Sequence, residues 1–186
     1  MVKRFARQWG QSAARILRGF ALLSFVALVG LPAAAFAQNK QAVANEGTAL
    51  EVLLPVAGAY CAYRNEDFVS YATRFAGQEI TIEAAKRAAG NSNWNQRPDG
   101  NSNGIMSGHT GAAVFGASYL NHRCISAPVG RALVDGLAVY VGYSRVAADR
   151  HTIGQVLAGA LVGYAFENLS VDVSSHQVAV KFRYNF

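Results

Sequence analysis

The segment after His151 carries its apolar residues three and four positions apart. They are Ile153, Val156, Leu157, Ala160, Leu161 and Tyr164. This is the period of one face of an α-helix, so the sequence predicts a helix that begins close to His151. The unpaired N–H groups and the dipole at a helix N-terminus favour a bound anion. The same field opposes protonation of an imidazole, so His151 is a candidate for a neutral nucleophile.

Arg145 lies six residues before His151 and can reach the same anion as a planar, charged fork. A histidine near a helix start is also commonly a surface or capping residue. The segment therefore indicates an anion site only if other parts of the chain supply matching groups.

The chain before this segment repeats short helical patterns. Helices are expected over residues 49–63, kinked or interrupted at Pro55, over 67–76 and 79–89, separated by Gly77, and from Ser107 and Pro128 onward. In the helix from Pro128, the residues expected to face inward are Val129, Leu133, Leu137, Tyr140 and Val141. Residues 38–46 are polar and expected to be loose. Residues 90–104 form a long polar loop, which is typical of a functional or a disordered segment.

The last residues change period. Val178, Val180, Phe182, Tyr184 and Phe186 alternate with other residues, which indicates a strand, and Val171 and Val173 are candidates for its partner. The expected fold class is all-α: a bundle of about five to six short helices with a small C-terminal β-hairpin. The expected boundaries are 38–168 for the helical domain and 169–186 for the hairpin tail.

The net charge of +6 has a local origin. Five of the 17 basic residues lie in the first 18 positions, which leaves 12 basic residues against 11 acidic ones in the rest of the chain. The rest of the chain therefore gives no reason to expect a nucleic-acid partner.

The N-terminus has the order of a secretory signal peptide. The basic residues lead into an apolar run, Gly19 to Leu31, and then into small residues that end at Ala37. Residues 1–37 are expected to be removed on export to the periplasm; the alternative is an uncleaved helix that anchors the protein in the inner membrane. In an oxidising compartment, Cys61 and Cys124 could form a disulfide.

Three separated segments carry groups that suit phosphoryl transfer. Lys86, Arg97 and Arg145 supply three positive charges, and Ser107 and Gly108 supply hydrogen bonds. Fixed cations and N–H donors stabilise the charge on the equatorial oxygens of a phosphoryl group in transfer. His109 and His151 allow one histidine to attack and the other to protonate the leaving group.

This arrangement resembles the phosphatidic acid phosphatase type 2 superfamily, which includes bacterial acid phosphatases and vanadium haloperoxidases. The resemblance covers roughly residues 86–166 and is most specific at Ser144-Arg145 with His151, supported by Ser107-Gly108-His109-Thr110. It implies that His151 forms a phosphohistidine and that His109 is the general acid. It also implies a phosphate cradle made of Lys86, Arg97, Ser107, Gly108 and Arg145.

Three positions depart from the family pattern. Met106 stands where the family has proline, and Lys86 lies 11 positions before Arg97 where the family uses seven, so Arg87 is a competing candidate. Gln155 stands where the family has the aspartate that orients the nucleophilic histidine. A glutamine can offer its carbonyl oxygen to Nδ1–H, but it brings no charge to stabilise an imidazolium.

The resemblance implies a metal-independent phosphomonoesterase that needs no cofactor. Its substrate would be a lipid phosphate, a lipid-linked diphosphate or a small organic phosphate, with a membrane surface as a possible partner. One alternative is a degenerate member that binds phosphate or lipid headgroups without turnover; the presence of Gln155 in place of the aspartate suggests it. The other is a vanadate-dependent haloperoxidase, because vanadate can occupy the same cradle.

Overall fold

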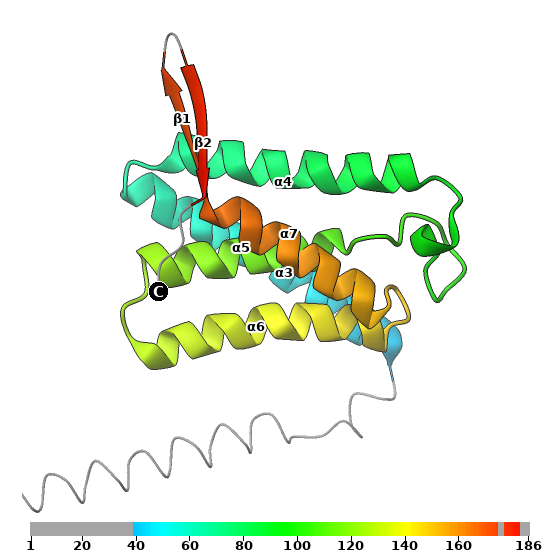
Figure 1. The fold of residues 1–186 in the computed structure, drawn as a ribbon. Helices are drawn as coiled ribbons and strands as arrows, with labels where there is room; N and C mark the ends of the chain where they lie inside the picture. The colour runs from blue at the N-terminus through cyan, green and yellow to red at the C-terminus, as the bar shows by residue number, and fades with distance from the viewer. Residues whose placement is uncertain (1–38, 175–176, 183–186) are drawn as a thin grey trace, which may run out of the picture. The chain divides into compact units, whose positions relative to one another are not determined.

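The computed structural model describes residues 39–174 and 177–182. The expected signal peptide, residues 1–37, lies outside the described residues. Within them the chain forms five α-helices, one short 3₁₀ helix and two strands (Figure 1). The helices are α3 (Lys40–Arg64), α4 (Phe68–Ala89), η1 (Asn93–Asn95), α5 (Gly108–Arg123), α6 (Pro128–Ala147) and α7 (Ile153–Asn168). The predicted all-α class is confirmed in this helical arrangement.

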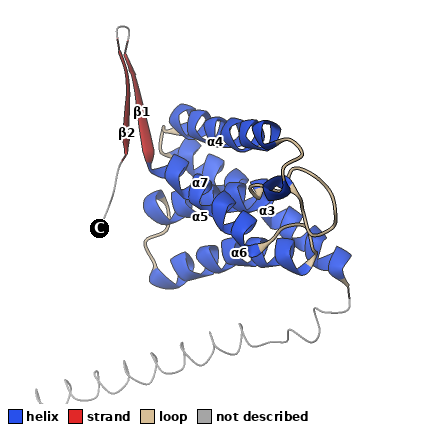
Figure 2. Cartoon of the chain, turned by 45° about the vertical axis from the view of Figure 1, so that its right-hand side comes forward, coloured by secondary structure: helices blue, strands red, loops and turns tan. Residues whose placement is uncertain are grey.

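Helix α5 is the central helix and packs against α3, α6 and α7 (Figures 1 and 2). Glycines allow these close approaches. A Cβ on Gly116 of α5 would lie 2.5 Å from the backbone of Leu54 in α3, and a Cβ on Gly163 of α7 would lie 2.3 Å from the carbonyl oxygen of Gly111 in α5. A larger residue at either position would force the helices apart.

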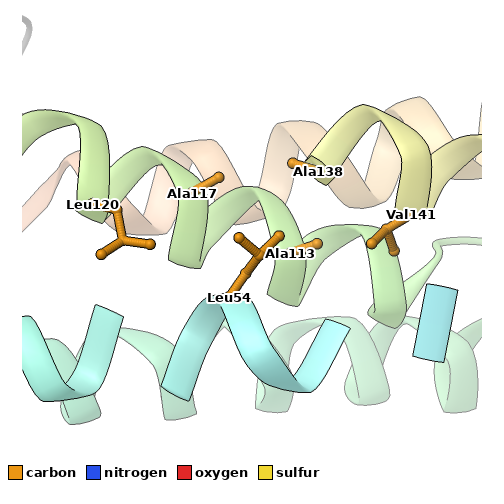
Figure 3. Packing of buried hydrophobic residues seen from close by; sticks show 6 residues of the cluster. All are labelled: Leu54, Ala113, Ala117, Leu120, Ala138 and Val141. Atoms are coloured by element: carbon orange, nitrogen blue, oxygen red, sulfur yellow. The ribbon is translucent and has the colours of Figure 1, made fainter. Parts of the chain in front are cut away.

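Two hydrophobic clusters fill the spaces around α5. The first joins α3, α5 and α6 and consists of Leu54, Ala113, Ala117, Leu120, Ala138 and Val141 (Figure 3). The second joins α3, α4 and α5 and consists of Ala62, Tyr71, Phe115 and Tyr119. Tyr71 donates a hydrogen bond of 2.7 Å to the carbonyl oxygen of Pro55, so its hydroxyl is satisfied where it is buried.

Two expected helix boundaries were wrong. Residues 40–46 are not loose, because α3 begins at Lys40 and buries Val43 and Ala44. Residues 68–89 form one helix, since Gly77 does not break α4. A Cβ on Gly77 would lie 2.9 Å from the ring of Phe166 in α7, so this glycine serves helix packing rather than helix termination.

The expected inward face of α6 was right for Val141, which is buried, and wrong for three other residues. Val129, Leu133 and Leu137 are 71%, 54% and 38% exposed, whereas Ala138 and Val141 are buried. Helix α6 meets its neighbours through its small residues and through the end of the helix that carries Ser144 and Arg145. Val129, Leu133 and Leu137 therefore face outward.

Cys61 of α3 and Cys124, the C-cap of α5, form a disulfide across 63 residues of sequence. After α7 the backbone continues into β1 (Leu169–Ser174) and β2 (Gln177–Phe182), which pair antiparallel with Val171 opposite Val180. The end of the expected tail, residues 183–186, lies outside the described residues. Among the described helices, none combines the length and apolar character needed to cross a bilayer.

Candidate active site

A cavity of about 230 Å³ lies where four parts of the fold meet. These parts are the N-terminal half of α3, the start of α5, the last turn of α6, and the segment that precedes α7. The polar loop between α4 and α5 adds Arg97. The lining residues are Gln41, Ala44, Asn45, Thr48, Arg97, His109, Arg145, Arg150 and His151. The structure thus brings together four of the residues that the sequence singled out: Arg97, His109, Arg145 and His151.

His151 is 3% exposed and lies one residue before Thr152, the N-cap of α7. Its Nδ1 is 3.3 Å from the carbonyl oxygen of Gly104 and 3.2 Å from Oε1 of Gln155. Both neighbours are acceptors, so Nδ1 carries the proton and Nε2 has the lone pair. Burial, followed by the charge of Arg97, lowers the pKa of His151 to about 4, although the bonds to Gln155 and Gly104 act in the opposite direction. The imidazole is therefore neutral at pH 7.

The orientation of Gln155 is fixed on both sides of its amide. Its Nε2 donates to the carbonyl oxygen of Gln96 at 2.8 Å and approaches that of Trp94 at 3.5 Å. Its Oε1 accepts from the backbone N–H of Thr152 at 3.1 Å and completes a capping box with that residue. These contacts turn the amide oxygen toward His151, and Gln155 is itself buried.

Arg145 is buried and held by three acceptors. It donates to Oγ of Ser144 at 3.0 Å, to Oγ1 of Thr48 at 3.3 Å, and to the carbonyl oxygen of Ala44. Burial is the main cause that lowers its pKa. A Cβ on Gly47 would lie 1.9 Å from Oγ of Ser144, so only glycine fits beside this arginine. Among the described carboxylates, none forms an ion pair with Arg145, which leaves its charge available to an anion.

The other cations lie at the loop side of the site. Arg97 donates to the carbonyl oxygen of Asn103 at 3.1 Å, and Arg150 forms a salt bridge with Asp99 at 3.4 Å. Sequence reasoning missed Arg150, although it is adjacent to His151. Lys86 does not line the cavity, but its Nζ would lie 3.6 Å from a Cβ on Gly108.

Arg87, the competitor of Lys86, pairs with Glu83 at 3.1 Å on the exposed side of α4. The structure therefore brings Lys86, and not Arg87, next to the start of α5. Gly108 is the first residue of that helix.

Ser107 is not among the cavity residues, because its side chain caps α5. Its Oγ accepts from the backbone N–H of Thr110 at 3.3 Å and from the Thr110 hydroxyl at 2.9 Å, and Ser107 is fully buried. The backbone N–H of Ser107 donates to the carbonyl oxygen of Gln155 at 2.9 Å. This bond fixes the start of α5, with His109, against the start of α7.

His109 contacts a residue that sequence reasoning left out of the site. Its Nε2 lies 2.9 Å from Oε2 of Glu51 in α3. The one available signal was that Glu51 is the only charged residue in the apolar stretch from Ala49 to Tyr63.

The arrangement can bind a phosphoryl group and exchange protons with it. Three guanidinium groups and two histidines line one cavity, and one of the histidines has a free lone pair. Such a set suits the charge that develops in phosphoryl transfer.

Comparison with known proteins agrees with this geometry. The sequence model of the PAP2 superfamily matches residues 70–178, more than half of the chain. No curated protein and no solved structure gives a significant match. The matched region includes His109, Arg145 and His151 but not α3. The chain therefore belongs to the PAP2 superfamily, whose members are generally phosphatases.

Proposed function

We propose that this protein is a phosphatase that cleaves phosphoric monoesters through a covalent intermediate on His151. The observation that carries the proposal is the state of this ring: its Nδ1–H is engaged by Gly104 and Gln155, and its pKa is about 4. At neutral pH such an imidazole has an unprotonated Nε2, as a nucleophile toward phosphorus requires.

The reaction proceeds in two steps. Nε2 of His151 bonds to phosphorus as the bond to the leaving-group oxygen breaks, and that oxygen takes a proton from His109. A water molecule then attacks the phosphohistidine and gives its proton to His109, which releases inorganic phosphate. Neither step needs a metal ion or a cofactor.

The cations act on the charge of the transferred group. Arg97 and Arg145 line the cavity and stabilise the equatorial oxygens, and Arg150 adds a third guanidinium. Lys86 and the backbone N–H of Gly108 complete the cradle. Ser107 has an indirect role, since its hydroxyl caps α5.

The substrate class that we propose is a lipid phosphate or a lipid-linked diphosphate at a membrane surface. The support is the number of large apolar side chains that three helices expose. They are Val52, Leu53, Val56, Tyr60 and Tyr63 on α3, Val129, Leu133, Leu137, Val139 and Tyr143 on α6, and Ile153, Leu157, Leu161 and Tyr164 on α7. Exposed apolar surface of this extent is typical of an interaction site. Small soluble phosphates are the alternative substrates.

Vesicles distinguish the two substrate classes. We expect Leu133→Glu and Leu161→Glu to lower turnover of phosphatidic acid in vesicles and to leave turnover of p-nitrophenyl phosphate unchanged. Ile80→Glu, at an exposed position of α4, is the matched control. Equal behaviour of all three variants on vesicles would favour soluble substrates.

We also propose that the mature protein is periplasmic and begins at Gln38. The Cys61–Cys124 disulfide supports export, because disulfides persist in oxidising compartments. N-terminal sequencing of protein from the periplasm tests this. Recovery of chains that retain Met1 in the membrane fraction would favour the anchored form.

The activity is tested with p-nitrophenyl phosphate and purified mature protein. We expect turnover that resists EDTA, is inhibited by vanadate, and is abolished in His151→Asn while phosphate binding remains measurable. Phosphate binding without turnover in the wild type would instead support a degenerate binding protein, an alternative that the neutral side chain of Gln155 suggests. Oxidation of halide by peroxide in the presence of vanadate would support a haloperoxidase.

A further inference from the structure

The N-terminal half of α3 forms one wall of the active site, although it lies outside the residues matched by the PAP2 model. Ala44 and Thr48 accept hydrogen bonds from Arg145, and Glu51, one turn further along, contacts His109. The contacts from Ala44 and Thr48 hold the side chain of Arg145 in place. The contact between Glu51 and His109 needs a separate explanation, because a histidine can protonate a leaving group without a carboxylate beside it.

Glu51 is well placed to control the ring of His109. Its Oε2 lies 2.9 Å from Nε2, and its side chain is 23% exposed, so water screens the pair only in part. Glu79 of α4 is the other carboxylate close to His109, but its Oε1 accepts from Gln78 at 2.9 Å. Glu51 is thus the carboxylate that contacts the imidazole directly.

We propose that Glu51 is the positioning residue of the general acid: it holds a proton on Nε2 of His109, so that Nδ1 exchanges protons with the substrate. The inference rests on the proposed phosphatase function. A carboxylate on one ring nitrogen fixes the tautomer and the ring orientation, and it stabilises the imidazolium.

The proton balance of each step follows from this arrangement. Before the first step, His109 is an imidazolium with one proton on Nε2, shared with Glu51, and one on Nδ1. As the phosphorus–oxygen bond breaks, the leaving oxygen keeps the bonding electrons and takes the Nδ1 proton. His109 is then neutral with its proton on Nε2, and its Nδ1 lone pair accepts a proton from the water that hydrolyses the phosphohistidine.

Leaving-group dependence is the kinetic test. An alkyl phosphate needs protonation of its leaving oxygen, whereas p-nitrophenolate needs little. We expect Glu51→Gln to lower kcat for an alkyl phosphate by about 10-fold or more, to affect p-nitrophenyl phosphate less, and to change KM little. We expect Glu51→Asp to restore part of the loss.

Glu46→Gln is the matched control, because Glu46 is on the same helix but binds the hydroxyl of Tyr140 away from the cavity. Equal losses on both substrates in Glu51→Gln would overturn the proposal. A gain in activity would also overturn it, because Glu51 would then be a competitor of the substrate for His109.

Nitrogen-15 NMR of the histidine side chains gives a readout that does not depend on turnover. In the wild type, at a pH where the ring of His109 is neutral, we expect the Nε2–H tautomer, with this proton protected from exchange with water. We expect Glu51→Ala to lose that protection. The variant His109→Gln identifies which signal belongs to His109. If the wild type has no phosphatase activity, the proposed function fails and this measurement alone decides the role of Glu51. An unchanged His109 signal in Glu51→Ala would refute it.

Discussion

Oε1 of Gln155 lies 3.2 Å from Nδ1 of His151, one turn into the helix that follows the histidine. A neutral amide thus makes the contact for which the family pattern has an aspartate. The contact fixes the tautomer of His151 without supplying charge. The low pKa of His151 is consistent with this, because burial and Arg97 lower it and none of the described carboxylates offsets them.

The stability of the protein should depend on pH through His151. Its folded pKa of about 4 is below the ordinary value of 6.5, so the unfolded chain binds more protons between these two values. Stability should therefore fall as pH is lowered from 6.5 to 4, by up to about 3 kcal/mol from this group. Denaturant unfolding of the wild type and of His151→Gln across this range measures the effect. Parallel pH profiles of the two proteins would contradict it.

Gly47→Ala should damage the site through Arg145. The new methyl group would lie 1.9 Å from Oγ of Ser144 and 2.6 Å from a terminal nitrogen of Arg145, so these side chains must move. We expect a loss of about 1–3 kcal/mol in the free energy of unfolding, together with weaker phosphate binding. Gly136→Ala on α6 is the control, because no atom lies within 4 Å of its Cβ position. That variant should be neutral or more stable by up to about 1 kcal/mol.

Opening the disulfide should affect stability more than activity. It joins Cys61 to Cys124 at the C-terminal end of α5, whereas His109 lies at the N-terminal end of the same helix. We expect Cys61→Ala/Cys124→Ala to lose about 2–4 kcal/mol of unfolding free energy with little change in KM. Thermal unfolding and steady-state kinetics at a temperature where both proteins are folded provide the comparison. A large rise in KM would mean that the disulfide also shapes the site.

The sequence predicted the starts of α5, α6 and α7 well because these are local features. Ser107 caps α5, Pro128 is the first residue of α6, and Thr152 caps α7 directly after His151. Capping and the fixed φ of proline depend on a few neighbouring residues, so they can be recognised without the fold. The family resemblance, carried by the spacing of a few residues, was also recognisable and is confirmed.

Features that depend on tertiary contacts were predicted poorly. The period of α6 correctly placed Val141 on the face that packs but also placed Leu133 there, whereas α5 presents small residues and meets Ala138 and Val141 rather than Leu133. Gly77 has the local character of a helix breaker, but Phe166 of α7 occupies the space beside it. Glu51 entered the site only when α3 packed beside α5.

Gln155→Asp gives the most informative single substitution. An aspartate could still accept from Nδ1–H of His151, and its charge would raise the pKa of His151 and stabilise the positive charge that forms on the ring. We expect kcat to rise by about 10-fold, with little change in KM.

The same substitution removes the donor to the carbonyl oxygen of Gln96, a bond of 2.8 Å, and shortens a side chain that takes part in the capping box of α7. Loss of this part-buried hydrogen bond costs about 1 kcal/mol, so the variant should also unfold at a lower temperature. Steady-state kinetics and thermal unfolding on the same preparation separate the two effects. A folded variant with unchanged or lower kcat would show that Gln155 only orients His151 and that the missing negative charge does not limit turnover.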